Sequence, residues 1–133
     1  MAKVTVNVDG GARGNPGPAA IGVVVRDADG AVLEALGETI GRATNNVAEY
    51  KALLRGIELA AEHGASEVEL VGDSELIVRQ VEGRYKVKNE AMKGLHAEAK
   101  KALAGFDGWS IRHVKRGENA DADRLVNEAL DNA

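Results

Sequence analysis

The chain has 133 residues, of which 44% are hydrophobic and 29% charged, and its formal net charge is −4. These values are ordinary for one globular domain, so we expect residues 1–133 to form a single domain with its own core. The absence of cysteine excludes disulfides and thiolate metal sites. No apolar run approaches the roughly 18 residues of a membrane helix, and no secretory signal pattern is present, which together predict a cytoplasmic protein without membrane contact.

The hydrophobic pattern predicts three strands followed by helices that alternate with strands. The first strand, residues 3–9, alternates strictly and places Val4, Val6 and Val8 on one face. Apolar residues at helical spacing predict a helix over 46–63. The other expected elements are strands at 20–26, 31–38, 67–72 and 109–115 and helices at about 74–82, 90–104 and 120–131. This βββαβααβα order predicts an α/β fold, a five-stranded mixed sheet with helices packed on it.

Glycine and proline crowd the connection after the first predicted strand, residues 10–18. The spacing of Gly11, Gly14 and Gly17 matches neither the dinucleotide-binding pattern nor the P-loop. The next element is a strand, whereas both motifs need a helix N-terminus there, so a nucleotide-cofactor loop is excluded. Two interpretations stay open: a tight connection without a ligand, and a loop whose backbone closely approaches a ligand.

Carboxylates stand at the ends of several predicted elements. Asp9 ends the first strand and Asp73 follows the strand at 67–72, where ligands of α/β sheets gather. Each also has a structural interpretation nearby, because Asp73 suits a helix N-cap and Glu49 would complete a capping box with Asn46. Glu49 nevertheless lies on the packed side of its predicted helix, where a carboxylate is costly unless it is paired or bound to a cation.

The last predicted helix offers two more carboxylates, Asp121 and Asp123. Helical spacing favours Asp123 on the inward side but leaves Asp121 open, and both would suit the positive end of a helix dipole. Several converging carboxylates would repel one another without a cation, and oxygen ligands suit Mg²⁺ or Mn²⁺ rather than zinc. Two such ions about 4 Å apart are a known arrangement for phosphodiester hydrolysis.

Four blocks of the sequence, VDGGARGNPGP, ATNNVAEYKAL, GDS and NADADRL, are similar in order and separation to the signatures of type I ribonuclease H. The resemblance covers the chain from Lys3 to about Asp131 and is to the compact archaeal and actinobacterial variants. It implies a ribonuclease H-like fold and an endonuclease that hydrolyses the RNA strand of RNA–DNA hybrids, leaving 5′-phosphate and 3′-hydroxyl ends. It also implies two Mg²⁺ ions, for which Mn²⁺ can substitute, and no protein partner, so we expect a monomer.

The same resemblance assigns roles to individual residues. It implies that the metal ligands and catalytic carboxylates are Asp9, Glu49, Asp73 and Asp123, and thereby favours Asp123 over Asp121. Glu49 would also accept a hydrogen bond from a substrate 2′-hydroxyl, the group that distinguishes RNA from DNA. The implied substrate contacts are the backbone of Gly10 and Gly11 and the side chains of Asn15, Thr44, Asn45 and Asn46. The glycines would let the backbone enter a minor groove without a clash of Cβ atoms.

The chain departs from the best-known family members in three places, one of which is Glu75, where many relatives have a glutamine that contacts the substrate. The loop before the last aspartate has no histidine, and Arg116 stands there instead; arginine cannot act as a base, so its expected role is to stabilise charge or position a phosphate. The basic protrusion is also missing, and either Arg84, Lys86 and Lys88 partly replace it, with Tyr85 packed, or this segment is solvated. Double-stranded RNA as a substrate and a non-catalytic hybrid-binding module stay open as alternatives.

Overall fold

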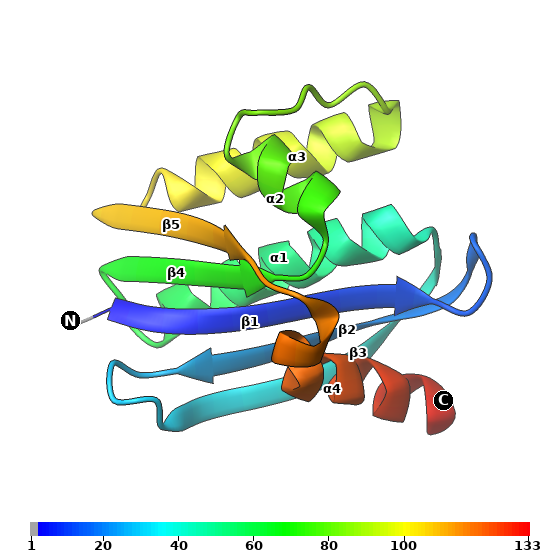
Figure 1. The fold of residues 1–133 in the computed structure, drawn as a ribbon, viewed down its shortest axis with the longest axis horizontal. Coiled ribbons are helices and arrows are strands. Elements are labelled where there is room, and N and C mark those ends of the chain that lie inside the picture. Colours follow the sequence, from blue (N-terminus) through cyan, green and yellow to red (C-terminus); the bar gives the residue numbers. More distant parts are fainter. Residues whose placement is uncertain (1–2) are drawn as a thin grey trace.

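The computed structural model describes residues 3–133, which form one five-stranded sheet with the strand order β3-β2-β1-β4-β5 (Figure 1). β1 pairs antiparallel with β2 and parallel with β4, so the sheet is mixed, which confirms the predicted fold class. β2 and β3 are antiparallel, and β4 and β5 are parallel. The strands are β1 (Lys3–Ala12), β2 (Gly17–Arg26), β3 (Val32–Ala43), β4 (Glu67–Gly72) and β5 (Gly108–His113).

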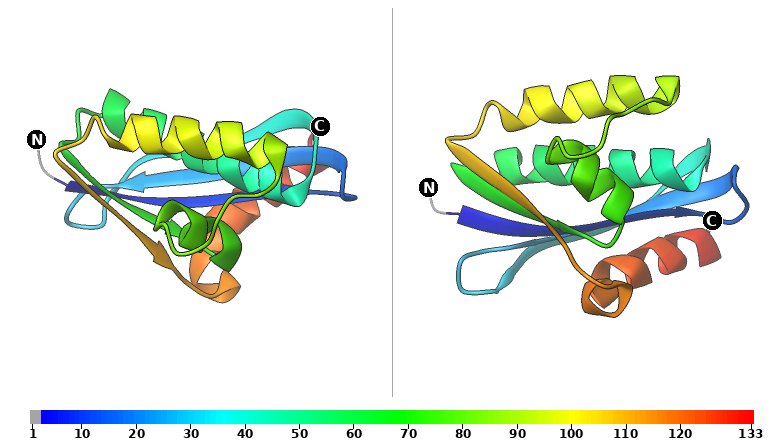
Figure 2. Two further views of the ribbon diagram at one scale, coloured as in Figure 1. Left: turned by 90° about the horizontal axis from the view of Figure 1, so that it is seen from above. Right: turned by 45° about the horizontal axis from the view of Figure 1, so that its top comes forward.

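Helices cover both faces of this sheet (Figure 2). α1 (Asn45–Glu62) and α3 (Glu90–Leu103) lie on one face, and α4 (Ala120–Asp131) lies on the other. The short α2 (Glu75–Val81) follows β4 and contacts β5, and a 3₁₀ turn, η1 (Arg116–Asn119), leads into α4. Within residues 3–133, no helix combines the length and the apolar character needed to cross a bilayer.

The main hydrophobic core lies between the sheet and α1. Val6, Val8 and Val23 point from β1 and β2 toward Gly56 of α1. A Cβ atom at Gly56 would lie 2.8 Å from Val8 Cγ1, so this glycine lets the helix approach the sheet closely, as the sequence predicts. The alternation of β1 places Asp9 on the opposite face, where α4 packs.

The connection after β1 is much shorter than the sequence predicts. β1 continues past Asp9 to Ala12 and β2 begins at Gly17, so residues 13–16 alone form the turn. Gly10, inside β1, serves close packing: a Cβ atom there would lie 2.2 Å from the Ala48 carbonyl oxygen on α1. The prediction that the strand ends at Asp9 is therefore wrong, because glycine here marks helix contact and not a loop.

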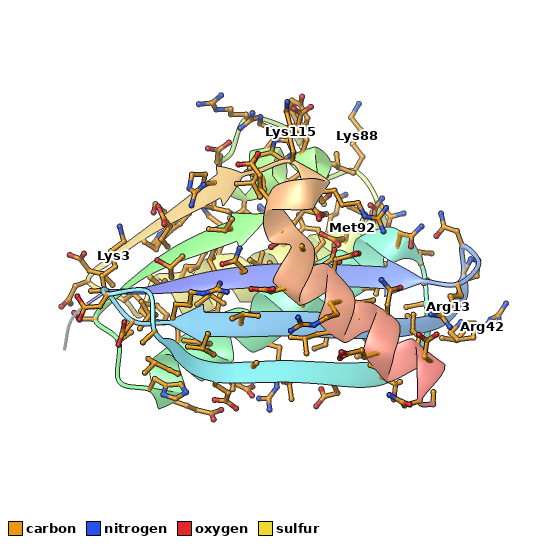
Figure 3. The ribbon with its side chains drawn as sticks, turned by 60° about the horizontal axis from the view of Figure 1, so that its bottom comes forward. Lys3, Arg13, Arg42, Lys88, Met92 and Lys115 are labelled. Atoms are coloured by element: carbon orange, nitrogen blue, oxygen red, sulfur yellow. The ribbon has the colours of Figure 1, made fainter. Side chains whose placement is uncertain are left out.

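α4 packs directly on two glycines of the opposite face. Gly22 and Gly37 are cross-strand partners on β2 and β3. A Cβ atom at Gly22 would lie 2.2 Å from the Ala122 carbonyl oxygen, and one at Gly37 would lie 2.8 Å from that of Leu125. α4 therefore crosses the sheet with its backbone against the strands (Figure 3). Because Gly22 is also the partner of Asp9, this packing brings the start of α4 over β1.

Candidate active site

Asp9 and Asp73 follow equivalent positions on two neighbouring parallel strands. The ladder between β1 and β4 ends at the pair Val8 and Gly72, and the next residue on each strand is an aspartate. Asp73 does not cap α2, because Ser74 is the N-cap residue and its hydroxyl accepts a hydrogen bond from the Ile77 amide. The N-cap interpretation of Asp73 is therefore wrong, and its carboxylate is free to face the site.

Glu49 reaches the same place from α1. This helix is capped by Thr44, whose hydroxyl accepts from the Val47 amide at 3.2 Å, so the expected capping box between Asn46 and Glu49 is wrong. The carboxylate of Glu49 instead accepts a hydrogen bond from the Gly10 amide at 2.7 Å. One carboxylate oxygen each of Asp9, Glu49 and Asp73 lie within 4.8 Å of one another.

Asp123 of α4 lies at the edge of this carboxylate cluster. Its Oδ1 accepts from Arg116 at 3.2 Å, and its Oδ2 lies 3.5 Å from the amide nitrogen of Asn127. Asp121 points elsewhere and forms an ion pair with Arg26 at 2.6 Å. Of the two aspartates that spacing leaves open, Asp123 is thus the one beside the cluster.

Burial and mutual repulsion disfavour charge on the cluster. Burial is the largest cause that raises the pKa of Asp9 from 3.8 to about 7; the hydrogen bond with Glu49 opposes it, and the charges of Asp73 and Asp123 add to it. Burial and the neighbouring charge of Asp9 likewise raise the pKa of Glu49 well above its ordinary value. Burial also raises the pKa of Asp73. Carboxylates that resist ionisation in each other's presence form an oxygen donor set that fits a hard divalent cation.

A cleft of about 500 Å³ opens over the cluster. Its lining includes nine of the eleven residues predicted for the site or for substrate contact: Asp9, Gly10, Gly11, Asn45, Asn46, Glu49, Asp73, Arg116 and Asp123. Asn15 and Thr44 do not line it. The side chain of Asn15 accepts from the Asn45 amide at 3.0 Å, and that of Asn45 accepts from the Ala12 amide at 2.9 Å. These two asparagines therefore tie the β1–β2 turn to the start of α1.

The structure gives a packing reason for the first of the two glycines, Gly10. Gly10 lacks a Cβ atom because Ala48 is in contact with it, and its amide already donates to Glu49. Gly11 has space for a Cβ atom, which would meet only Val126 at 3.7 Å. Packing of α1 by itself requires a glycine at position 10, and the expected contact of these glycines with a minor groove stays a prediction.

The segment between α2 and α3 is exposed, and the expected packing of Tyr85 is wrong. The Tyr85 side chain is 46% exposed, and Val87 is the residue that packs against the core. Lys86 and Lys88 are exposed on either side of Val87. The packing of Val87 in place of Tyr85 leaves open whether Arg84, Lys86 and Lys88 partly replace the protrusion or the segment is solvated.

Asn119 is a further buried residue of this region that the sequence patterns do not single out. It is 1% exposed, and its side-chain amide donates to the Val8 carbonyl at 2.8 Å. An asparagine just before a helix is typical of an N-cap, and this ordinary pattern conceals its inward orientation. Only the fold, which brings η1 against β1, reveals the contact.

The strand order and the carboxylate cleft define an α/β domain of the ribonuclease H-like class. A family model described as reverse transcriptase-like matches residues 7–129. A ribonuclease H of Erythrobacter litoralis is 34% identical over 98% of this chain and 98% of its own length. The chain belongs to the type I ribonuclease H family.

More similar relatives support this assignment. Ribonuclease HI of Halobacterium salinarum is 47% identical over 98% of this chain, and its crystal structure superposes with a TM-score of 0.96, covering 99% of the crystallised chain. The chain spans 66% of that curated relative and 36% of a Mycobacterium tuberculosis relative described as a bifunctional protein. LC11-RNase H1, solved in complex with an RNA/DNA hybrid, is 46% identical with a TM-score of 0.92 over 97% of each chain.

Proposed function

We propose that this domain is an endoribonuclease that hydrolyses the RNA strand of RNA–DNA hybrids to 5′-phosphate and 3′-hydroxyl ends. The observation that carries the proposal is the meeting of Asp9, Glu49 and Asp73 within 4.8 Å at the floor of a cleft, in a chain of the ribonuclease H family. The hybrid as substrate is supported by LC11-RNase H1, a similar protein solved with that ligand. The carboxylates of this chain are the groups that would face the scissile phosphate.

Divalent metal is the cofactor that the carboxylate cluster and the family indicate. We propose two Mg²⁺ ions, replaceable by Mn²⁺, held by Asp9, Glu49, Asp73 and Asp123. When bound, such ions polarise the phosphate and lower the pKa of a bound water for in-line attack. The Gly10 amide holds Glu49 in place, and Glu49 can also accept from a substrate 2′-hydroxyl.

Arg116 is proposed to offset negative charge near the reacting phosphate. It is 79% exposed, lines the cleft and reaches Asp123. Because a guanidinium keeps its protons at all ordinary pH values, this residue cannot remove a proton from water. Its contribution is electrostatic, and Arg116→Lys would keep the charge but lose the planar, two-pronged geometry.

The substrate path is proposed to run over Gly10, Gly11, Asn15, Thr44, Asn45 and Asn46. Asn46 is exposed at the cleft, and Asn45 lines it beside the β1–β2 turn. Asn15 accepts from the Asn45 backbone amide and Thr44 caps α1, so both hold the start of this helix in place. We further propose that the chain is a single domain, monomeric and cytoplasmic. Light scattering of the purified chain tests the proposed monomer.

Cleavage of one labelled RNA strand tests the proposed function. The strand is paired in turn with DNA or with RNA, or left single, and each is incubated with Mg²⁺, with Mn²⁺ or with a chelator. We expect metal-dependent cutting of the hybrid and none of the single strand. Asp73→Asn should abolish cutting, whereas Asp29→Asn, in the exposed β2–β3 turn, should not. No cutting of any duplex by folded protein would overturn the proposal and favour a non-catalytic binding module.

A further inference from the structure

A chain of polar side chains crosses the sheet face that carries α4 and ends at Asp73. Nη1 of Arg26 donates to Oδ1 of Asn7 at 3.2 Å. Nδ2 of Asn7 donates to Oδ1 of Asn119 at 3.0 Å. Nδ2 of Asn119 donates to the Val8 carbonyl at 2.8 Å and lies 3.5 Å from Oδ2 of Asp73. We call Arg26, Asn7 and Asn119 the amide relay.

The chemistry of arginine fixes the direction of this relay. A guanidinium has donors and no acceptor, so the amide oxygen of Asn7 must face Arg26. The amino group of Asn7 then faces Asn119, whose oxygen accepts it. The amino group of Asn119 is consequently turned toward Val8 and Asp73. Each amide therefore has one orientation that satisfies its neighbours, and in both asparagines the amino group lies on the side nearer to Asp73.

The Asn119 side chain is buried in the relay although it could instead cap the N-terminus of α4. Asn119 stands at the N-cap position of α4 but makes no capping hydrogen bond, although such a bond typically stabilises a helix. Its side chain is instead turned inward and is 1% exposed. Burying an amide is costly unless its donors and acceptor are paired, and the relay supplies those partners.

We propose that Asn119 is a positioning residue that orients the carboxylate of Asp73 for cation binding, and that Asn7 and Arg26 fix the Asn119 amide. This inference rests on the proposed function, because it assumes that Asp73 is a metal ligand. The relay draws one oxygen of Asp73 toward Asn119. The contact of Asn119 with Val8 also ties η1 to β1. Partners that orient metal ligands typically contribute about 10- to 100-fold to metal affinity or activity.

Three substitutions test the relay, with Asn132→Ala, a change at an exposed asparagine near the C-terminus, as the matched control. Asn119→Leu keeps a similar volume and removes the amide, whereas Asn119→Asp keeps the acceptor for Asn7 and removes the donor to Asp73. Asn7→Ala leaves Asn119 in place without its orienting partner. Calorimetric titration with Mn²⁺ in the absence of substrate is the first measurement. The others are kcat and KM on the hybrid and the melting temperature in chelator.

We expect Asn119→Leu and Asn119→Asp to weaken Mn²⁺ affinity about 10- to 100-fold and to lower kcat with little change in KM. Asn7→Ala should weaken Mn²⁺ affinity less than the Asn119 variants do. Combined with Asn119→Leu, it should cause no further loss of affinity, because Asn7 acts on Asp73 only through Asn119. Asn132→Ala should match the wild type. If Asn119→Leu does not fold, Asn7→Ala carries the test by itself.

An unchanged Mn²⁺ affinity and kcat in a folded Asn119→Leu variant would overturn the inference, even if its melting temperature falls. An unchanged Asn7→Ala would overturn the role of the relay. Failure of the proposed function looks different, because the wild type would then bind no divalent ion or cut no duplex.

Discussion

At the scale of single residues, the cleft places buried carboxylates where folding alone would not favour them. Asp9 and Glu49 are 7% and 8% exposed, and burial together with the neighbouring carboxylates raises the pKa of both. Ionised carboxylates at such short separations repel one another, and the desolvation cost adds to this repulsion. The site therefore reduces the stability of the metal-free protein and is a place where substitutions can raise stability while removing function.

The Asp9→Asn variant should separate these two effects. The amide keeps the shape of the carboxylate but removes a buried charge, so the metal-free protein should melt at a higher temperature at pH 8. Cleavage of the hybrid should be abolished, while binding of the hybrid in chelator should persist. Thermal unfolding in chelator and the labelled-strand assay measure the two, with Asp29→Asn as the control. A lower melting temperature than the wild type would indicate a structural role for Asp9 instead.

The stability of the metal-free protein should fall as pH rises from about 4 to about 7. The pKa of Asp9 is about 7 in the folded protein and 3.8 ordinarily, so the folded state retains a proton that the unfolded state has lost in this window. Stability decreases with pH wherever the folded state binds more protons, and it should level off above pH 7. The free energy of unfolding is measured by urea in chelator over this pH range for the wild type and for Asp9→Asn. The difference between the two isolates the contribution of Asp9. A difference that rises with pH would contradict the raised pKa.

At the scale of elements, glycines determine how closely each helix approaches the sheet. Gly56 and Gly10 admit α1 on one face, and Gly22 and Gly37 admit α4 on the other. Both helices carry a carboxylate of the candidate site, Glu49 on α1 and Asp123 on α4. The packing of each helix on the sheet therefore also fixes the position of its carboxylate. A methyl group added at one of these glycines should disturb both the packing and the site.

Gly22→Ala should lower the free energy of unfolding by at least about 1–3 kcal/mol, because the new Cβ atom meets the α4 backbone rather than a movable side chain. It should also reduce cleavage by displacing Asp123. Gly94→Ala is the control, since its Cβ atom on exposed α3 meets nothing within 4 Å and should add about 0.5–1 kcal/mol of stability. Urea unfolding measures both. Equal stability of Gly22→Ala and the wild type would show that α4 can shift at no cost.

At the scale of the whole molecule, the chain is acidic while the proposed substrate, an RNA–DNA hybrid, is a polyanion. The net charge is −4, and the cleft itself is lined by carboxylates, so binding depends on metal and on local groups of basic residues. Arg13 and Arg42 line one cavity beside the end of α4, and Lys88 and Lys115 lie at another side of the molecule (Figure 3). Attraction of this kind weakens as salt is added, because it derives from release of counterions.

The affinity for hybrid should therefore fall steeply with salt, and the Lys86→Ala/Lys88→Ala double variant should show a shallower dependence. If both lysines contact phosphates, the log–log slope should decrease in magnitude by up to about 2. Fluorescence anisotropy of a labelled hybrid in chelator, over a salt series, measures the slope, and Lys101→Ala on α3 is the control. An unchanged slope would mean that the segment between α2 and α3 is solvated surface.

The sequence by itself determined the order of the elements, the mixed sheet and the carboxylates that could meet. Strand alternation and helical spacing are local patterns, and β4 has the predicted ends, Glu67–Gly72. The four signature blocks likewise identified the family, because each is a short run of residues whose order along the chain can be read directly.

The tertiary structure alone decided where β1 ends, why position 10 is glycine and which way Asn119 turns. Each of these depends on a contact between residues far apart in the chain. Gly10 meets Ala48 across the sheet–helix boundary, and Asn119 bonds to Val8 over a separation of 111 residues. Local patterns cannot report such contacts. By its neighbours in the sequence, Gly10 is equally typical of a loop and Asn119 of a helix N-cap, and only the fold brings their distant partners into contact.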